Sequence, residues 1–347
     1  MSHSLIYVLH SGQMFGTERM ALATLDALRE RSSSVIIAPP GPVHAAARAA
    51  GVTSEVAASR WAVLRALWRQ LHRHPHSALL TTGVWQSAAG WAMQLLTGGR
   101  GAHLHMVHGG TDERLSYGRK RWLTGLPLRF VAVSDFVRQR LLAHGVPAER
   151  IEVVGNFLPT GPIVQRAPFR QDGVRRVVML SRLDRIKRVG LLFDALERVP
   201  GLGVLQFDIY GSGEEAAVLR ERARHHPNVT LHGFVPDASA ALTSADLLLH
   251  TCPEEPFGLV LLEAFAAGVP VLVPNSGGAG DLVQHDINGW HFSANDPVAL
   301  GRELRVLAAA PAAALNTLVY GGRRALARRH DPQRQAQRYA RLMGLPA

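Results

Sequence analysis

The stretch ADLLLHTCPEEPFGLVLLEAFAAGVPVLVP (245–274) holds an apolar strand, a charged turn, a helix-length segment and a second apolar strand. The first strand is expected to end at His250, and the helix to begin at Gly258. Apolar strands that alternate with helices are typical of parallel sheets covered on both faces. This stretch therefore predicts one βαβ unit of a doubly wound α/β fold.

The same alternation runs along the whole chain in two series. A length of 347 residues also exceeds what one core usually serves. The segment 158–173 separates the two series, and its three prolines and two glycines predict a linker. The expected strands are 5–10, 34–38, 78–82, 103–108, 129–134 and 150–155, then 175–181, 204–210, 229–233, 245–250, 269–274 and 289–293. The helix-length segments include 17–31, 61–73, 135–144, 187–198, 213–226, 258–267, 297–308 and 331–344.

The composition excludes several classes of protein. A hydrophobic fraction of 47% and a charged fraction of 19% are those of an ordinary globular chain. The single cysteine, Cys252, excludes a disulfide framework and a multi-cysteine metal site. The start of the chain is not expected to be a signal peptide, and no apolar run is expected to span a membrane. The motifs of zinc hydrolases and of serine hydrolases do not occur.

The net charge of +11 is unevenly distributed. Residues 1–160 carry +8, residues 161–319 carry −3, and residues 320–347 carry +6. A basic surface attracts nucleic acid, anionic lipid headgroups or an acidic substrate. The alternative is a coding bias, because 36 of the 38 basic residues are arginine. Nucleic-acid binding is not expected, since no reader motif occurs.

Two carboxylates flank the start of the expected helix at 258–267. Glu255 lies in the loop before it and Glu263 in its second turn. The helix N-terminus favours an anion such as phosphate, and a carboxylate beside it suits sugar hydroxyls. The alternative for Glu263 is a solvated helix residue, although its neighbours in the sequence are mostly apolar.

The segment SRLDRIKR (181–188) joins a strand to a helix. Arg182 and Lys187 are five residues apart and are expected to converge on one anion. An arginine fork and a lysine point charge suit a diphosphate. Surface charge is the simpler explanation for Arg185 and Arg188.

Candidate residues in the first half follow two of its strands. Gly12 and Gly16 let the backbone approach a ligand, or serve only a tight turn. His108 is a better candidate than His105, because it lies at the carboxyl end of its strand. The run RKRW (119–122) is a basic spot that follows shortly after, and we expect it on the acceptor side.

The segment RWAVLRALWRQLHRH (60–74) is amphipathic and basic, with two tryptophans. A helix of this kind lies on a membrane surface in some proteins. The alternative is a crossover helix that packs its apolar stripe on the sheet.

Taken together, these motifs resemble the retaining glycosyltransferases of family 4. The family has the GT-B fold: two Rossmann-like doubly wound α/β domains that face each other across a cleft. The resemblance implies an acceptor domain at 1–160, a linker at 161–173, a donor domain at 174–325, and a terminal helix at 326–347 that crosses back to the first domain. The segments that carry it are FGTER (15–19), HMVHG (105–109), AVSDFVRQRLLAHGVPAERIEVVGN (132–156), SRLDRIK (181–187), DIYGSGEE (208–215), VTLHGFV (229–235) and EEPFGLVLLEAFAAGVPVLVPNSGG (254–278).

The resemblance implies a role for each matching residue. Arg182 and Lys187 hold the diphosphate and stabilise the leaving group. Glu255 faces the donor sugar, Glu263 binds the ribose hydroxyls, and His108 contacts the transferred sugar. The remaining donor-binding positions are Gly16, Gly211, Phe234, Phe257, Gly258 and Leu259.

The family needs no metal or cofactor, and its front-face mechanism needs no second carboxylate. The expected partners are a nucleotide-sugar donor, with uridine preferred over guanosine, a glycan or lipid-linked acceptor, and an anionic membrane surface. The expected location is the cytoplasm, at the inner face of the plasma membrane. The sequence departs from the family at Ser181, which replaces a glycine, in VVGNFLP (153–159), which lacks the usual Asn-Gly, and at Asp281, which replaces a glutamate. None of these departures removes a charged residue of the clamp or of the glutamate pair. The rivals are a sugar-nucleotide 2-epimerase and a non-catalytic scaffold.

Overall fold

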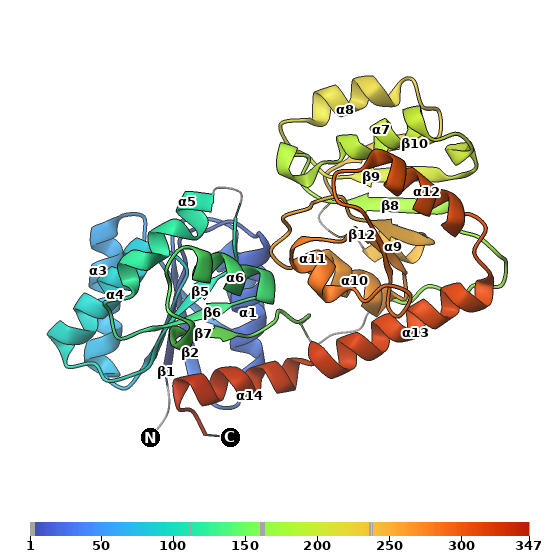
Figure 1. The fold of residues 1–347 in the computed structure, drawn as a ribbon. Helices are drawn as coiled ribbons and strands as arrows, with labels where there is room; N and C mark the ends of the chain where they lie inside the picture. The colour runs from blue at the N-terminus through green and yellow to red at the C-terminus, as the bar shows by residue number, and fades with distance from the viewer. Residues whose placement is uncertain (1–3, 111–112, 160–163, 236, 238, 347) are drawn as a thin grey trace. The chain divides into compact units, whose positions relative to one another are not determined.

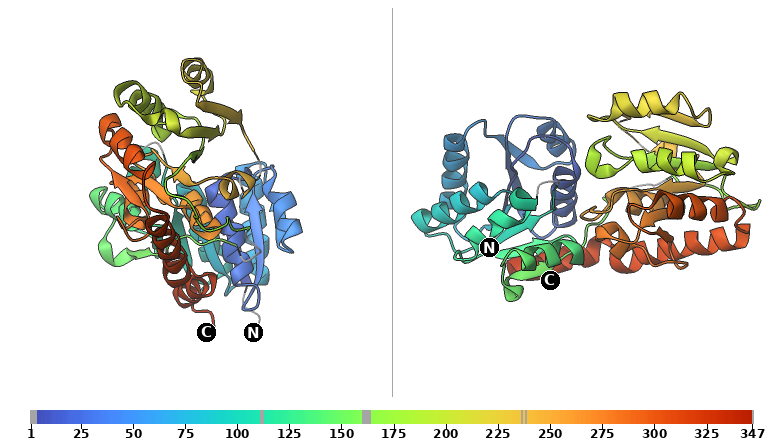
Figure 2. Two further views of the ribbon diagram at one scale, coloured as in Figure 1. Left: turned by 90° about the vertical axis from the view of Figure 1, so that its right-hand side faces the viewer. Right: turned by 45° about the horizontal axis from the view of Figure 1, so that its top comes forward.

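The computed structural model describes residues 4–110, 113–159, 164–235, 237 and 239–346, with the backbone alone for residues 113 and 114. The chain divides into unit 1, which comprises Met1–Thr160 and His330–Ala347, and unit 2, Gly161–Arg329 (Figure 1). Each unit is a parallel sheet with helices on both faces (Figures 1 and 2). The prediction of two doubly wound α/β units is confirmed.

Unit 1 has a seven-stranded sheet in the order β3-β2-β1-β4-β5-β6-β7. In it, Ile6 of β1 pairs with Val35 of β2 and with Leu79 of β4. The elements are β1 (Ser4–Val8), α1 (Gly16–Ala27), β2 (Ser33–Ala38), α2 (Val43–Ala49), β3 (Thr53–Val56), α3 (Arg60–Arg73), β4 (Ala78–Thr81), α4 (Val84–Thr97), β5 (His103–Val107), α5 (Glu113–Ser116), η1 (Gly118–Leu123), β6 (Arg129–Ala132), α6 (Asp135–Ala143), η2 (Ala148–Arg150), β7 (Ile151–Val153) and α14 (Pro332–Met343).

Unit 2 has a six-stranded sheet in the order β10-β9-β8-β11-β12-β13. In it, Val178 of β8 pairs with Asp208 of β9 and with Leu248 of β11. The elements are β8 (Arg176–Leu180), η3 (Arg185–Lys187), α7 (Gly190–Arg198), η4 (Leu202–Val204), β9 (Gln206–Tyr210), α8 (Ala216–Ala223), β10 (Val229–Gly233), α9 (Ser239–Thr243), β11 (Leu247–Leu249), α10 (Leu259–Ala267), β12 (Val271–Pro274), α11 (Gly277–Leu282), β13 (Trp290–Phe292), α12 (Pro297–Leu307) and α13 (Ala312–Arg329).

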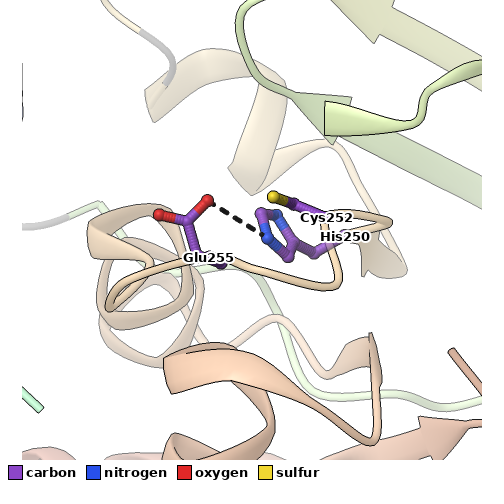
Figure 3. A group of neighbouring side chains, drawn as sticks. All are labelled: His250, Cys252 and Glu255. Carbon is purple, nitrogen blue, oxygen red and sulfur yellow. Dashed lines mark ion pairs between the residues drawn. The ribbon is translucent and has the colours of Figure 1, made fainter. Parts of the chain in front are cut away.

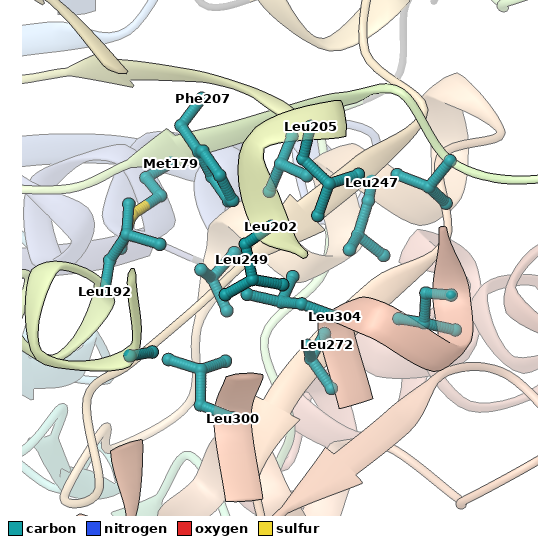
Figure 4. Close-up of a cluster of buried hydrophobic side chains, with 14 of the residues drawn as sticks. Met179, Leu192, Leu202, Leu205, Phe207, Leu247, Leu249, Leu272, Leu300 and Leu304 are labelled. Carbon is teal, nitrogen blue, oxygen red and sulfur yellow. The ribbon is translucent and has the colours of Figure 1, made fainter. Parts of the chain in front are cut away.

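The core of unit 2 lies between its sheet and the helices α7 and α12. Leucines of both helices meet strand residues such as Phe207 and Leu249, all of them buried (Figure 4). The start of α12 is fixed locally, because Asp296 accepts hydrogen bonds from the N–H groups of Val298 and Ala299 and Pro297 holds the first helical position.

Part of the expected linker belongs to unit 2. Residues 164–173 form no helix or strand, yet Phe169 is buried in the core of that unit. Its N–H donates to Asn316 Oδ1, and Asn316 Nδ2 donates to its carbonyl oxygen, both at 3.0 Å. The expected segment 326–347 is divided in the same way, since α13 ends in unit 2 at Arg329 and α14 packs on α1 in unit 1.

The helix α3 serves as a crossover helix and also presents aromatic side chains to solvent. Leu67 and Leu71 are buried in the core of unit 1, whereas Trp61 and Trp68 are 78% and 50% exposed. Within the described residues, no single helix is long and apolar enough to cross a membrane, although α12 and the segment 312–343, bent by 112°, pass that test as a pair.

Candidate active site

The order of strands in each sheet decides where its functional residues gather. In unit 1 the order reverses between β1 and β4, and in unit 2 between β8 and β11. Ligands of open α/β sheets bind outside the carboxyl ends of the strands at such a switch point. In unit 2, Ser181 and Arg182 follow β8 and His250 follows β11. Most of the predicted donor residues therefore lie at or near this edge of unit 2.

Glu255 is at the centre of a largely buried ionic cluster. Its Oε2 atom lies 2.6 Å from Nζ of Lys187 and 3.4 Å from Nε2 of His250 (Figure 3 draws the histidine contact). The exposed fractions of the Glu255, Lys187 and His250 side chains are 13%, 17% and 5%. Thr251 also donates a hydrogen bond to the Lys187 carbonyl oxygen at 2.8 Å, which ties η3 to the loop after β11.

The cluster keeps both members of the pair charged. Burial favours a raised pKa for Glu255, but the charge of Lys187 and the nearby His250 ring outweigh burial and hold that pKa below its usual range. Burial favours a lowered pKa for Lys187, but the charge of Glu255 outweighs it and the pKa of Lys187 is raised. Arg182 lies near enough for its charge to lower that pKa slightly.

Three side chains in this cluster could hold a metal ion. Ligand atoms of His250, Cys252 and Glu255 lie within 4.8 Å of one another (Figure 3). Burial, however, raises the pKa of the Cys252 thiol to about 11, so the thiolate that metals prefer is disfavoured. The Lys187 ammonium already contacts the same Glu255 oxygen that a cation would use. Charge at this position therefore comes from Lys187 itself.

The loop that carries Glu255 rests on the start of α11. Gly278 N–H donates to the Glu255 carbonyl oxygen at 2.7 Å, and Ser276 Oγ donates to the Pro253 carbonyl oxygen at 2.8 Å. A Cβ atom at Gly278 would lie 2.1 Å from the Pro256 carbonyl oxygen. Only glycine allows the loop to approach this closely.

The glycine and the helix start that follow the loop lie where they are expected. Gly258 has a φ of +89° and precedes α10, whose first residue is Leu259. Phe257 is buried, and Glu263 is half-buried in the second turn of α10. The N-terminal end of this helix carries partial positive charge beside the Glu255 loop.

The other predicted donor residues are placed differently from Lys187. Arg182 is 53% exposed and pairs with Asp184 at 2.6 Å, so it does not share a partner with Lys187. Gly211 has a φ of +147°, and a Cβ atom there would lie 1.8 Å from the Ser181 carbonyl oxygen. Phe234, after β10, is 71% exposed.

Unit 1 contains a separate cavity at its own switch point. The cavity has a volume of about 510 Å³, and its lining includes His10, Thr82 and His108. His10 N–H donates to Thr82 Oγ1 at 2.9 Å, which joins the ends of β1 and β4. Gly16 is the first residue of α1, and the next residue, Thr17, lines the cavity.

The histidines at β5 separate into a structural and a candidate binding residue. His105 is fully buried and lies 2.7 Å from Ser87 Oγ through Nδ1. His108 lines the cavity, and burial lowers its pKa to about 4. Gly12 is a packing residue, because a Cβ atom there would lie 2.3 Å from the Pro39 carbonyl oxygen.

Sequence reasoning missed several residues of these two sites. His250, Cys252, Asp184 and Gly278 surround the Lys187–Glu255 pair, and His10 lies in the cavity of unit 1. His250 alone carried a signal, because it is the first polar residue after a continuous apolar strand.

Two family models match the chain. Residues 164–322 match the glycosyl transferases group 1, and residues 15–161 match glycosyltransferase family 4. The chain belongs to the group 1 glycosyltransferases of family 4. The resemblance that the motifs predict is confirmed.

Sequence relatives of this family 4 member include two curated proteins. One is the GDP-mannose-dependent alpha-(1-6)-phosphatidylinositol monomannoside mannosyltransferase of Mycobacterium tuberculosis, 34% identical over 45% of this chain and 46% of the relative. The other is the lipopolysaccharide core biosynthesis glycosyltransferase LpsE of Rhizobium meliloti, 28% identical over 46% of this chain and 48% of the relative. The chain spans between 35% and 48% of the length of such relatives.

Solved structures give the fold of this family 4 glycosyltransferase. It is similar to HepE of Anabaena in complex with UDP and glucose, with a TM-score of 0.82 at 18% identity over 98% of this chain and 99% of the other. It is also similar to the lipopolysaccharide outer core galactosyltransferase WaaB, with a TM-score of 0.79 at 16% identity over 98% of this chain and 99% of the other. The GT-B fold is therefore confirmed.

Proposed function

We propose that this protein is a retaining, metal-independent glycosyltransferase that moves a sugar from a nucleotide-diphosphate sugar to a glycan or lipid-linked acceptor. The partly buried Lys187–Glu255 pair at the switch point of unit 2 carries this proposal. Such a pair holds an ammonium in place for the leaving diphosphate before the donor arrives. The product would belong to cell-envelope polysaccharide, lipopolysaccharide or glycolipid biosynthesis.

The chemistry assigned to the pair is electrostatic. When the bond between the sugar and the diphosphate breaks, negative charge grows on the leaving oxygen. Lys187, with Arg182 released from Asp184, stabilises that charge. Glu255 holds Lys187 charged and aimed, and its other oxygen remains for the donor sugar. In the front-face mechanism the leaving phosphate accepts the proton of the acceptor hydroxyl, so no side chain is required as nucleophile.

Uridine is the preferred donor base in this proposal, and guanosine is the alternative. The structure of HepE holds UDP, which supports uridine, whereas the relative from Mycobacterium tuberculosis is named for GDP-mannose. Gly211 and Phe234 lie after β9 and β10 and are our candidates for contact with the base.

A donor panel tests the proposal. UDP, GDP, ADP and their sugar conjugates are added without metal to the wild type, to Lys187→Ala and to Arg185→Ala, an exposed neighbour in η3. A ligand at a hundred times its dissociation constant adds about 2.7 kcal/mol of stability. We expect one nucleotide to raise the melting temperature of the wild type and of Arg185→Ala by a few degrees, but not that of Lys187→Ala. Turnover should fall about 100-fold or more in Lys187→Ala.

Two other outcomes would contradict the proposal. If no nucleotide stabilises the wild type, the scaffold alternative is favoured. If the sugar nucleotide is converted to its 2-epimer without an acceptor, the protein is an epimerase.

We also propose that unit 1 binds an anionic membrane surface at the inner face of the plasma membrane. Trp61 and Trp68 on α3 are exposed, and arginines lie beside them on the same helix. Tryptophan with arginine suits the lipid interface. Binding to anionic vesicles should weaken with salt and with Trp61→Ala and Trp68→Ala combined. The control Tyr320→Ala removes an exposed aromatic side chain of unit 2. Salt-insensitive partitioning would contradict this proposal.

A further inference from the structure

The cavity of unit 1 is lined by basic groups. His10, His108, Arg119 and Lys120 all contribute to its wall. None of the described lining residues is an aspartate or a glutamate. The Lys187–Glu255 site of unit 2, in contrast, has its carboxylate built in.

Lys120 is buried, and no carboxylate among the described residues serves as its counterion. The residue is 8% exposed, and Nζ donates a hydrogen bond to the Leu115 carbonyl oxygen at 3.3 Å. In the part of the chain that the structure describes, no carboxylate forms an ion pair with it. Burial, together with the charge of Arg119, lowers the pKa of Lys120 to about 8. A buried ammonium of this kind is stabilised by any anion that enters the cavity.

The histidines in the wall leave the lysine as the main charge. Burial lowers the pKa of His108 to about 4, and burial followed by the charge of Lys120 lowers that of His10. Both rings are therefore neutral near pH 7. Nε2 of His108 is buried and has no hydrogen-bond partner among the described residues. Arg119 is exposed and adds a second cation at the wall.

We infer that this cavity binds an oxyanion, the phosphate or carboxylate group of the acceptor, and that Lys120 and Arg119 recognise it. The volume of about 510 Å³ accommodates a sugar as well as its charged group. Lys120 is thus a specificity-determining residue for an anionic acceptor. The identification of the bound group as part of the acceptor rests on the proposed function, whereas the anion site itself rests on the cavity alone.

The lysine content allows the inference to be tested directly. The chain has two lysines, Lys120 and Lys187, one in each unit. Full-length protein labelled with ¹³C at lysine Cε gives one resonance for each, and Lys187→Ala assigns them. UDP or GDP is added to saturation first, so that phosphate probes cannot occupy the Lys187 site. Glucose 6-phosphate, glucuronate and methyl glucoside are then titrated as the phosphate, the carboxylate and the neutral probe.

We expect the Lys120 resonance to shift when the phosphate or the carboxylate probe is added, and not when methyl glucoside is added. The pKa of Lys120 should rise by about one unit or more, since an anion favours the charged form. Arg119→Ala should weaken the affinity about tenfold, and Arg121→Ala, its exposed neighbour, should not change it. The stronger of the two anionic probes identifies the charged group of the acceptor.

Three outcomes separate this inference from the proposed function. If Lys187 responds to the nucleotide and Lys120 to no anion, the inference is wrong and the proposed function stands. If methyl glucoside shifts the Lys120 resonance as much as the anions do, the cavity does not select for negative charge and the inference is also wrong. If Lys120 responds to an anion but Lys187 to no nucleotide, the anion site is supported and the proposed function fails.

Discussion

Lys187 and Lys120 show how environment decides the behaviour of one side chain. Lys187 is largely buried against Glu255, whose charge raises its pKa, whereas Lys120 is buried with a hydrogen bond to a backbone carbonyl oxygen, and its pKa is lowered. The first environment keeps a cation permanently charged for a leaving group. The second makes the charge depend on what fills the cavity.

Replacing Glu255 by glutamine tests the first environment. The variant leaves Lys187 without its counterion, so we expect the pKa of Lys187 to fall and unit 2 to lose about 3–5 kcal/mol of stability. Urea unfolding and the lysine Cε resonance measure the two effects. Glu214→Gln, an exposed carboxylate of the same unit, is the control and should change neither. A Lys187 resonance that titrates as in the wild type would contradict the expectation.

Residue types and spacing predicted which side chains gather at the switch point of unit 2 better than they predicted the contacts between those side chains. The sequence places Arg182 and Lys187 five residues apart, which favours convergence on one anion. It does not show that Asp184 lies close enough to hold Arg182 aside. Lys120 stands in a run of arginines typical of a surface, and only the fold buries it. Burial and pairing depend on distant segments, so local pattern cannot supply them.

At the scale of elements, the loop after β11 is held in place by α11, the helix that follows β12. Gly277 and Gly278 begin α11 directly beneath residues 253–256, and backbone and hydroxyl hydrogen bonds join the two segments. The position of Glu255 is therefore decided by a helix that follows it by more than twenty residues.

Substituting Gly278 by alanine tests this support. The added Cβ would lie 2.1 Å from the Pro256 carbonyl oxygen, so the loop must move and carry Glu255 away from Lys187. We expect transferase activity to fall at least tenfold, with a modest loss of stability. Gly203→Ala is the matched control, because no atom lies within 4 Å of its added Cβ. Unchanged activity in Gly278→Ala would show that the loop position is not critical.

Most strands could be predicted because each is a short, continuous apolar run. The strand β3 was missed, since TSEV (53–56) is half-exposed and has a single strongly apolar residue. The helix α4 was missed as well, because VWQSAAGWAMQLLT (84–97) is too apolar for a clear amphipathic period. Elements such as β3 and α4 are defined by tertiary packing and not by their own sequence pattern, so the sequence alone does not predict them.

At the scale of the whole molecule, the two units differ in their response to acid. Burial lowers the pKa of His103 and His108 in unit 1 to about 4, from about 6.5. The unfolded chain then binds more protons than the folded one between these values, so stability falls as pH drops from about 6.5 to 4. In unit 2, the lowered pKa of Glu255 gives stability that is present above about 4.5 and is lost only below it.

We therefore predict that unit 1 unfolds first on acidification. Each histidine contributes at most about 1.4 kcal/mol per pH unit inside this window. Tryptophan fluorescence follows unit 1, because five of the six tryptophans belong to it. The urea midpoint should fall between pH 7 and pH 5, less steeply in His103→Gln, and as in the wild type in His76→Gln, an exposed control. A midpoint independent of pH would contradict the prediction.

The helix α14 belongs to unit 1, although it follows unit 2 in the sequence. Tyr339 is 1% exposed, and His330 Nδ1 lies 2.8 Å from the Asn156 carbonyl oxygen, so the helix is part of the core and not an appendage. A ribosome synthesises all of unit 2 between Thr160 and this helix. During translation unit 2 is therefore complete before unit 1, because α1 receives its packing partner α14 only at the end of synthesis.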